Sequence, residues 1–171
     1  MIIREAKETD LLTIIEIYNA AVPTRKATAD LKPISLESRR EWFKKHDPEQ
    51  YPIWVIALEG RVVGWLSLQM FYGRVAYQKT AEVSLYIASD YQGRGIGKLL
   101  VEYALERCPK LGISNLICII FAHNQASIRL FEKFGFQRWG YLPQIADLED
   151  FLADVVILGK KIAEIGNSPH S

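Results

Sequence analysis

Three glycines, Gly93, Gly95 and Gly97, fall within five positions directly before a stretch with the apolar spacing of an amphipathic helix. Glycine costs a regular element about 0.5–1 kcal/mol relative to alanine, so three of them together need a structural or functional reason. Residues 80–88, just before them, are rich in β-branched and aromatic side chains and are expected to form a strand. A strand, a glycine turn and a helix therefore follow one another, as in α/β proteins.

Three kinds of glycine loop compete for this segment. A P-loop requires Ser or Thr after its Gly-Lys pair, whereas Leu99 stands there, and a dinucleotide fingerprint requires GxGxxG, whereas the spacing here is GxGxG. The third pattern, Gln or Arg followed by x-x-Gly-x-Gly at a helix start, is matched by Gln92, Gly95 and Gly97. Such a loop offers unpaired N–H groups to a pyrophosphate at the positive end of the helix dipole. A tight turn that needs positive φ explains the same glycines, so both interpretations stay open.

Apolar periodicity predicts further elements around this unit. Strands are expected at residues 2–6, 53–58, 61–71, 115–122 and 154–161. Helices are expected to begin near residues 10, 36 and 125. The segment 115–122 is almost entirely apolar, so it is expected to be buried on both faces. The order of elements predicts a mixed α/β fold, in which one layer of sheet carries helices on both faces.

The bulk properties of the chain argue against several classes of protein. Its 171 residues suit one domain, expected at residues 1–163, followed by a frayed tail at residues 164–171. A net charge of +1 gives no basic surplus for nucleic-acid binding, and no apolar run approaches the roughly 20 residues that cross a membrane. The charged first ten residues do not resemble a signal peptide, and the two cysteines form no CxxC or Cys/His cluster. We therefore expect a cytoplasmic protein without a metal.

Several ordered segments share a pattern with a known family. The segments are QGRGIG (92–97), HNQASIRLFEKFGF (123–136), EIYNAAVPTRKATAD (16–30), SLESRREWF (35–43) and RVAYQKTAEVSLYI (74–87). In these segments the chain resembles the GNAT acyltransferases, and within them the phosphinothricin acetyltransferase group. The resemblance implies a mixed, mostly antiparallel central sheet with helices on both faces, and a homodimer. It also implies transfer of an acetyl group from acetyl-CoA to the amine of a small amino-acid-like acceptor.

The resemblance places Glu82 at the position of the general base. An amine with a pKa near 10 is protonated at neutral pH, and removing its proton costs about 4 kcal/mol. A carboxylate in the cleft lowers this cost by accepting the proton, directly or through water. In a strand Glu82 shares one face with Ser84 and Tyr86, although a solvated carboxylate near a strand start is the alternative. The resemblance also places the N–H groups for the intermediate's oxygen in residues 85–87.

The resemblance assigns the CoA site to this strand, the glycine loop and the helix after residue 124. The predicted contacts are Leu85, Tyr86, Ile87, Gln92, Gly93, Arg94, Gly95, Ile96, Gly97, Lys98, Asn124, Ser127 and Lys133. Asn124 is placed at the pantetheine arm, while a helix N-cap explains it equally well. Lys133 is placed near a CoA phosphate, while a lysine beside Glu132 is also typical of solvated surface.

The acceptor site is implied by two other segments. In the family, the loop after the first helix and the residues before the glutamate line this site, which points to residues 24–30 and to a second set. That set is Arg74, Val75, Ala76 and Tyr77. Arg74 suggests a carboxylate or phosphinate on the acceptor, because a guanidinium binds such groups bidentately, while an exposed loop charge is the alternative.

The chain departs from the family at Phe131, where many members carry Tyr or His. Phenylalanine has no proton to give to the leaving thiolate, so we assign no general acid. The segment ADLEDFLAD (146–154) also replaces a basic, tryptophan-containing segment of the phosphinothricin group. Two alternatives therefore stay open: an acyl-CoA-binding sensor without turnover, and an acetyltransferase that acts on proteins.

Overall fold

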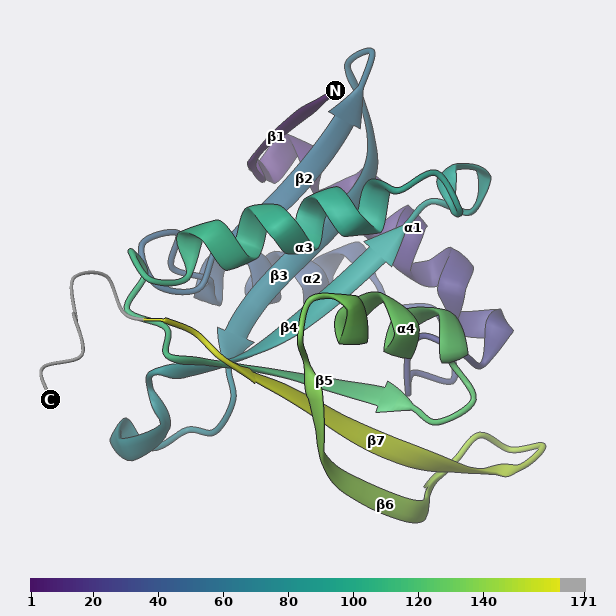
Figure 1. The fold of residues 1–171 in the computed structure, drawn as a ribbon. Coiled ribbons are helices and arrows are strands. Elements are labelled where there is room, and N and C mark those ends of the chain that lie inside the picture. The colour runs from purple at the N-terminus through teal and green to yellow at the C-terminus, as the bar shows by residue number, and fades with distance from the viewer. Residues whose placement is uncertain (164–171) are drawn as a thin grey trace, which may run out of the picture.

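A seven-stranded sheet forms the centre of the computed structural model, which describes residues 1–163 (Figure 1). The strands are β1 (Ile2–Glu5), β2 (Ile53–Leu58), β3 (Arg61–Met70), β4 (Thr80–Ile87), β5 (Asn115–Phe121), β6 (Gln137–Asp147) and β7 (Leu152–Lys161). Their order across the sheet is β1-β2-β3-β4-β5-β7-β6. Every neighbouring pair is antiparallel except β4 and β5, so the predicted mixed, mostly antiparallel sheet is confirmed. The predicted tail at residues 164–171 lies outside the described residues.

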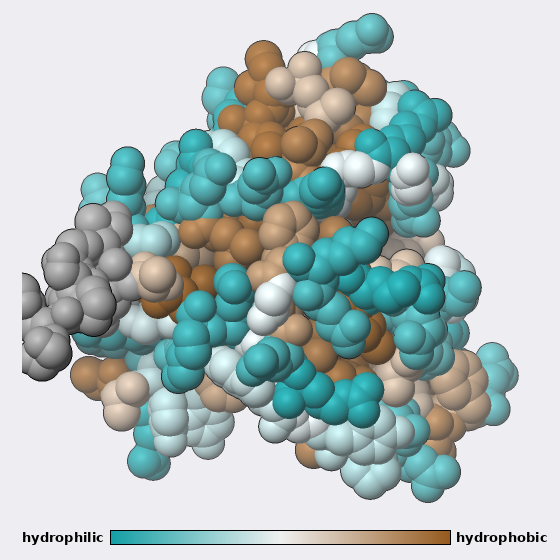
Figure 2. All heavy atoms as spheres, in the orientation of Figure 1, coloured by the Kyte–Doolittle hydropathy of each residue, from teal (hydrophilic) through white to brown (hydrophobic). Residues whose placement is uncertain are grey.

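Helices cover both faces of the sheet, as predicted. They are α1 (Leu11–Ala21), α2 (Leu36–Lys45), α3 (Ile96–Arg107) and α4 (Gln125–Lys133). Figure 1 shows α3 and α4 in front of the sheet and α1 and α2 behind it. Leu100 of α3 and Ile128 of α4 belong to one buried core, whereas Ile14 of α1 packs with Trp65 of β3 in another. Figure 2 shows hydrophilic residues along the outer sides of α3 and α4, as expected for amphipathic helices.

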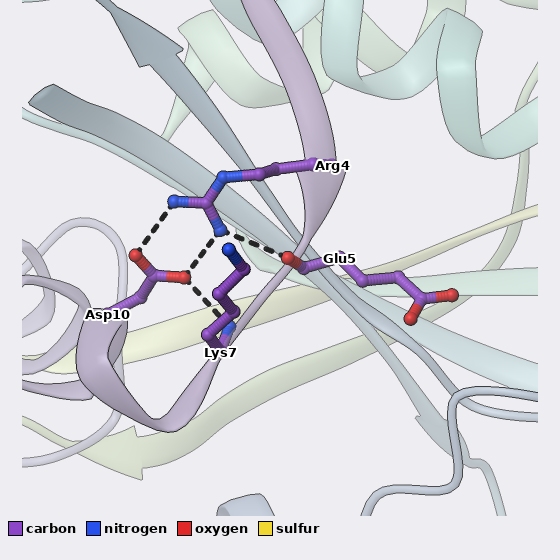
Figure 3. Close-up of polar contacts among 4 residues, drawn as sticks. All are labelled: Arg4, Glu5, Lys7 and Asp10. Atoms are coloured by element: carbon purple, nitrogen blue, oxygen red, sulfur yellow. Dashed lines mark hydrogen bonds and ion pairs between the residues drawn. The ribbon is translucent and has the colours of Figure 1, made fainter. Parts of the chain in front are cut away.

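An ion pair fixes the first strand to the start of the first helix (Figure 3). The guanidinium of Arg4 in β1 donates to both carboxylate oxygens of Asp10, at 2.7 and 2.9 Å. The same carboxylate accepts the backbone N–H of Lys7 at 2.7 Å, which closes the short turn before α1. The hydrogen bonds from Arg4 hold the pKa of Asp10 below its ordinary value. The edge of the sheet and the helix that packs behind it are therefore joined by one buried carboxylate.

We expect Asp10→Asn to lower the free energy of unfolding at neutral pH by about 1–2 kcal/mol, because Arg4 loses its carboxylate. The pKa of Asp10 is lowered on folding, so the stabilisation is present above its unfolded pKa and is lost as the pH falls through the folded one. Urea denaturation at neutral pH and at about pH 3 tests both statements, since the deficit should shrink in acid. Glu8→Gln, at an exposed carboxylate of the same turn, is the control. Equal losses in the two variants would contradict the prediction.

Candidate active site

The one parallel contact in the sheet is also the shortest. β4 and β5 pair only where Thr80, Ala81 and Glu82 face residues 115–117, and beyond that point the two strands diverge (Figure 1). A cavity of about 280 Å³ lies at this fork. It is lined by residues 26–29, 82–86 and 118–121, with Asn124, Ser127, Phe131, Ala146 and Val155. The size is close to the lower end of the range typical of small-molecule sites.

The hydrogen bonds of β4 determine which of its backbone groups face the fork. The N–H of Ala88 donates to Val63 at 2.8 Å, and the carbonyl of Thr80 accepts from Phe71 at 3.2 Å. Both bonds run toward β3, so the even-numbered residues of β4 direct their backbone groups to β3. Since consecutive residues of a strand alternate in direction, the odd-numbered residues direct theirs toward β5.

The fork therefore leaves a row of β4 backbone groups without a strand partner. Val83, Leu85 and Ile87 direct their N–H and C=O groups to the side from which β5 has departed. The carbonyl of Ile87 is bonded by the side chain of Gln92 at 3.2 Å. The register between β3 and β4 runs without a shift from Ala81 to Ile87, so the opening arises from the departure of β5 and not from a bulge in β4. The pairing of Glu82 with Ile117 uses the N–H of Val83, so the carbonyl of Val83 and the N–H and carbonyl of Leu85 are the groups left available to a bound molecule.

The glycine loop joins β4 to α3, and its three glycines have different physical reasons. Gly93 and Gly95 have φ of +75° and +78°, which L side chains rarely adopt, and the space where a Cβ would stand is open at both. At Gly97 a Cβ would lie 3.2 Å from a methyl group of Leu130 and 3.4 Å from one of Leu85. This glycine therefore allows α3 to pack closely on α4 and β4.

The start of α3 offers donors to an anion. Gly95 is its N-cap and makes no side-chain capping bond, so the N–H groups of the first turn have no side-chain partner there. Gln92, Arg94 and Lys98 are exposed around this turn, whereas Ile96 is buried beneath it. Arg94 lies over the ring of Tyr91, 5.1 Å from its centroid. Uncapped N–H groups, a helix dipole and two cations together favour a phosphate group.

Glu82 lies where β4 and β5 separate. Its Oε2 accepts a hydrogen bond of 3.2 Å from the side chain of Gln69, its direct partner on β3. The side chain is partly buried and lines the fork cavity. On the same face of β4, Tyr86 packs with α1 and β3, whereas Val83 faces the core under α3. The carboxylate is therefore held by a neutral amide at the edge of a cavity, a position suited to accepting a proton.

The start of α4 brings further polar groups to the cavity. The side chain of Asn124 accepts the N–H of Ser127 at 3.3 Å and donates to the carbonyl of Lys26 at 3.1 Å. Asn124 is thus the N-cap of α4 and also contacts the loop after α1. Lys133 lies at the other end of α4, is exposed and does not line the cavity. Phe131 does line it, 4% exposed, with its ring edge-on to Phe136.

Side chains of other elements hold the loop between α1 and α2 over the fork by hydrogen bonds to the carbonyl groups of the loop. Besides Asn124, the hydroxyl of Tyr86 donates to Ala27 at 3.0 Å and a ring nitrogen of His123 lies 2.6 Å from the carbonyl of Arg25. Three side chains from β4, from the end of β5 and from the start of α4 thus hold residues 25–27. Part of the predicted acceptor loop therefore lines the cavity.

The second predicted acceptor segment lies elsewhere. Arg74 and the short helix Val75–Tyr77 sit in the connection from β3 to β4, all exposed, and they line neither of the two cavities described here. Tyr77 packs edge-on against Tyr72 in the same connection, 5.5 Å between ring centroids. The role of these residues in acceptor binding therefore stays a prediction.

The β5 wall of the cavity was not among the site residues that the sequence predicted. Residues 118–121 line it, and Ile119 is 47% exposed, so the expectation that this strand is buried on both faces is wrong there. The reason is the fork, which removes the neighbouring strand on that side. Burial, with a smaller contribution from the charge of Glu82, raises the pKa of the Cys118 thiol well above its ordinary value, so Cys118 is a neutral wall residue.

Within residues 1–163, no three His, Cys, Asp or Glu side chains come together as a metal site would require. None of the helices described is both long and apolar enough to cross a membrane. The polar side chains that line the fork cavity are one carboxylate, one amide, one lysine and four hydroxyl groups: Glu82, Asn124, Lys26, Thr28, Ser84, Tyr86 and Ser127.

Comparison with known proteins identifies the class to which this site belongs. Residues 12–136 match the profile of the Acetyltransferase (GNAT) family. The protein of Bacillus subtilis named "Putative phosphinothricin acetyltransferase YwnH" is 44% identical over 164 residues, which cover 95% of this chain and all of that protein. The chain belongs to the GNAT acetyltransferase family, as its sequence motifs predicted.

Two further relatives add detail. The L-methionine sulfoximine/L-methionine sulfone acetyltransferase of Pseudomonas aeruginosa is 33% identical over 144 residues, 84% of each chain. A phosphinothricin acetyltransferase from Sinorhizobium meliloti, solved in complex with acetyl-CoA, superposes with a TM-score of 0.91 at 28% identity. That superposition covers 98% of this chain and 92% of the other.

Proposed function

We propose that this protein transfers the acetyl group of acetyl-CoA to the amine of a small amino-acid-like acceptor of the phosphinothricin or methionine sulfoximine type. The observation that carries the proposal is the fork, where Glu82 lies beside a cavity edged by unpaired N–H groups of β4. The named activities of the relatives from B. subtilis and P. aeruginosa support the choice of acceptor. Residues 1–163 would form the single catalytic domain.

The residues around the fork suit CoA in three ways. The uncapped first turn of α3, with Arg94 and Lys98 beside it, would hold the pyrophosphate. The free carbonyl of Val83 and the free N–H and carbonyl of Leu85 suit the amides of the pantetheine arm, and Asn124 with Ser127 adds polar contacts from the facing side. Acetyl-CoA supplies a thioester, whose carbonyl is the electrophile. The free N–H groups of this edge are the donors available to its oxygen.

Glu82 would take the proton from the acceptor amine. Its carboxylate accepts a neutral hydrogen bond from Gln69 and faces no ion-pair partner among residues 1–163, so it retains the capacity to accept a proton. The apolar ring of Phe131 closes the donor side of the cavity without a proton to give. The leaving thiolate, whose pKa resembles that of cysteine at roughly 8.5, would be protonated by water or by the product ammonium.

The proposal is tested by thiol release from acetyl-CoA with phosphinothricin, methionine sulfoximine and the common amino acids as acceptors. Release that depends on one of these amines is the expected result. Tight CoA binding without release would favour a sensor. Faster modification of an intact protein than of any free amino acid would favour a protein acetyltransferase.

We expect Glu82→Gln to lower kcat/KM by about 10²–10⁴-fold at neutral pH, because the amine must then lose its proton to water. The deficit should narrow as the pH approaches the pKa of the amine, since deprotonation no longer needs the carboxylate. A pH–rate profile measures this, with Glu102→Gln on the exposed side of α3 as the control. Full turnover by Glu82→Gln at neutral pH would remove the assignment of the base.

Gly95→Ala should weaken CoA binding about tenfold or more, because alanine at φ +78° displaces the N–H groups of the first turn. Gly112 provides a matched control, since its φ is +72° and the space for a Cβ is equally open. Both variants are expected to lose about 1–2 kcal/mol of stability. Only Gly95→Ala should change the affinity measured by titration calorimetry. Equal affinities of the two variants for CoA would show that Gly95 serves the turn and not CoA binding.

We also propose a homodimer in the cytoplasm. The cysteines at positions 108 and 118 are free and buried, as is usual in a reducing compartment. β6 is one of the two edge strands of the sheet, and it exposes large apolar side chains that a second subunit would cover. They are Trp139, Tyr141, Leu142 and Ile145.

Ile145→Lys should convert the dimer to a monomer with an unchanged circular dichroism spectrum, because a lysine placed in that contact would be buried without a partner. Leu12→Lys on α1 is the control, since Leu12 is 58% exposed and Ile145 is 59% exposed. Light scattering after size-exclusion chromatography measures the mass. A dimer that survives Ile145→Lys would place the interface elsewhere.

A further inference from the structure

A second cavity, of about 170 Å³, lies on the face of β4 that carries α1 and α2. It shares Ser84 and Tyr86 with the fork cavity, so the two cavities meet along β4. Gln69 lines the second cavity and donates to Glu82, which lines the first. A molecule in the second cavity would therefore lie beside the carboxylate of Glu82.

Cross-strand pairs of β3 and β4 make the floor of this second cavity. Ser67 lies directly opposite Ser84, two residues along each strand from the pair of Gln69 and Glu82. Residues two apart on one face of a strand are about 7 Å from each other, the scale of a small amino acid. The floor of the second cavity thus presents the amide of Gln69, which contacts the carboxylate of Glu82, and then the hydroxyl groups of Ser67 and Ser84.

One cation faces this floor. Arg39 of α2 lines the cavity, and its guanidinium carbon lies 4.6 Å from the ring centroids of both Tyr18 and Trp42. The side chain is partly buried, yet within residues 1–163 it forms no salt bridge and no hydrogen bond. By contrast, Arg4 and Arg25 each pair with a carboxylate. The two aromatic faces hold the guanidinium in place and leave its N–H donors unused.

We infer that Arg39 binds an oxyanion of the acceptor, a carboxylate or a phosphinate, and so positions the acceptor amine at Glu82. The inference rests on the proposed function and specifies its substrate class. A guanidinium offers planar, paired donors that match both oxygens of such a group, which a lysine ammonium does not. A partly buried cation without a counter-ion is otherwise unfavourable, and the bound acceptor supplies that counter-ion.

Arg39 is a better candidate for this role than Arg74. Arg74 was the arginine that the sequence suggested for the acceptor's anionic group, but it is exposed and lines neither cavity. The sequence alone does not distinguish Arg39 from its neighbour Arg40 in the segment SLESRREWF. In the structure this residue is the one on α2 whose charge is enclosed by Tyr18 and Trp42 above the β3–β4 floor.

The test compares L-methionine sulfoximine with its primary amide, which lacks the carboxylate, and phosphinothricin with its primary amide. We expect wild-type protein to prefer each acid over its amide in kcat/KM. Arg39→Gln should lower kcat/KM for the acids about 10²-fold, mainly through KM, with little change for the amides. Arg39→Lys should recover only part of the preference. The amines of the acid and the amide differ in pKa, but this difference affects every variant equally. It therefore cancels when the acid-to-amide ratio of kcat/KM is compared between variants.

Two variants serve as controls. Arg40→Gln changes the adjacent, exposed arginine of α2 and should leave the acid-to-amide ratio at its wild-type value. Arg74→Gln tests the alternative arginine and should also leave the ratio unchanged. A collapse of the ratio in Arg74→Gln, or an equal loss on acid and amide in Arg39→Gln, would overturn the inference while the proposed function stands.

A wild-type protein that accepts acid and amide equally would also overturn the inference, and this result requires no variant to fold. If neither acceptor is turned over in any form, the proposed function fails and the role of Arg39 fails with it. The two failures are thus distinguished by wild-type turnover alone.

Discussion

The central constraint in this structure is the short backbone pairing between β4 and β5. Parallel strands in the interior of a sheet normally satisfy each other's N–H and C=O groups along their whole length. Here the pairing ends at Glu82 and Ile117, and beyond it the carbonyl of Val83 and both backbone groups of Leu85 have no strand partner. Unpaired backbone groups in the middle of a sheet are unfavourable unless a ligand bonds them. The fold therefore contains a site whose donors are backbone atoms, fixed before any ligand arrives.

The surrounding elements keep this opening from collapsing. β5 is held on its other side by seven paired positions with β7, so it does not swing back onto β4. The loop after α1 lies across the mouth and is fixed by Tyr86, His123 and Asn124 through three of its carbonyls. Gly97 lets α3 pack on Leu130 and Leu85, which places the first turn of the helix beside Leu85, a residue of the cavity wall. Strand β7, the loop after α1 and the start of α3 thus all stabilise the opening between β4 and β5.

The sequence predicted the elements well because periodicity and glycine placement are local signals. The mixed sheet and the helices on both faces followed from them, and the positive φ of Gly93 and Gly95 matches the turn interpretation. The family followed instead from the resemblance of several ordered segments. What it could not predict depends on pairing between distant segments. Whether residues 118–121 face a strand or a cavity is set by where β4 and β5 part. Arg39 looks like surface charge until the rings of Tyr18 and Trp42 are placed on either side of it.

In the proposed reaction, the two cavities would place donor and acceptor against different sides of one strand, β4. The fork opens at the edge of β4 and is closed by Phe131 from the α4 side, whereas Glu82, Ser84 and the floor shared with Ser67 face α1 and α2. A donor held along the edge and an acceptor held on the floor would meet beside Glu82, which lines the fork cavity and is hydrogen-bonded to Gln69 of the second cavity. The proton would then be removed on the acceptor face, away from Phe131. An apolar ring on the donor side is consistent with this division, because the group that accepts a proton lies across the strand from it.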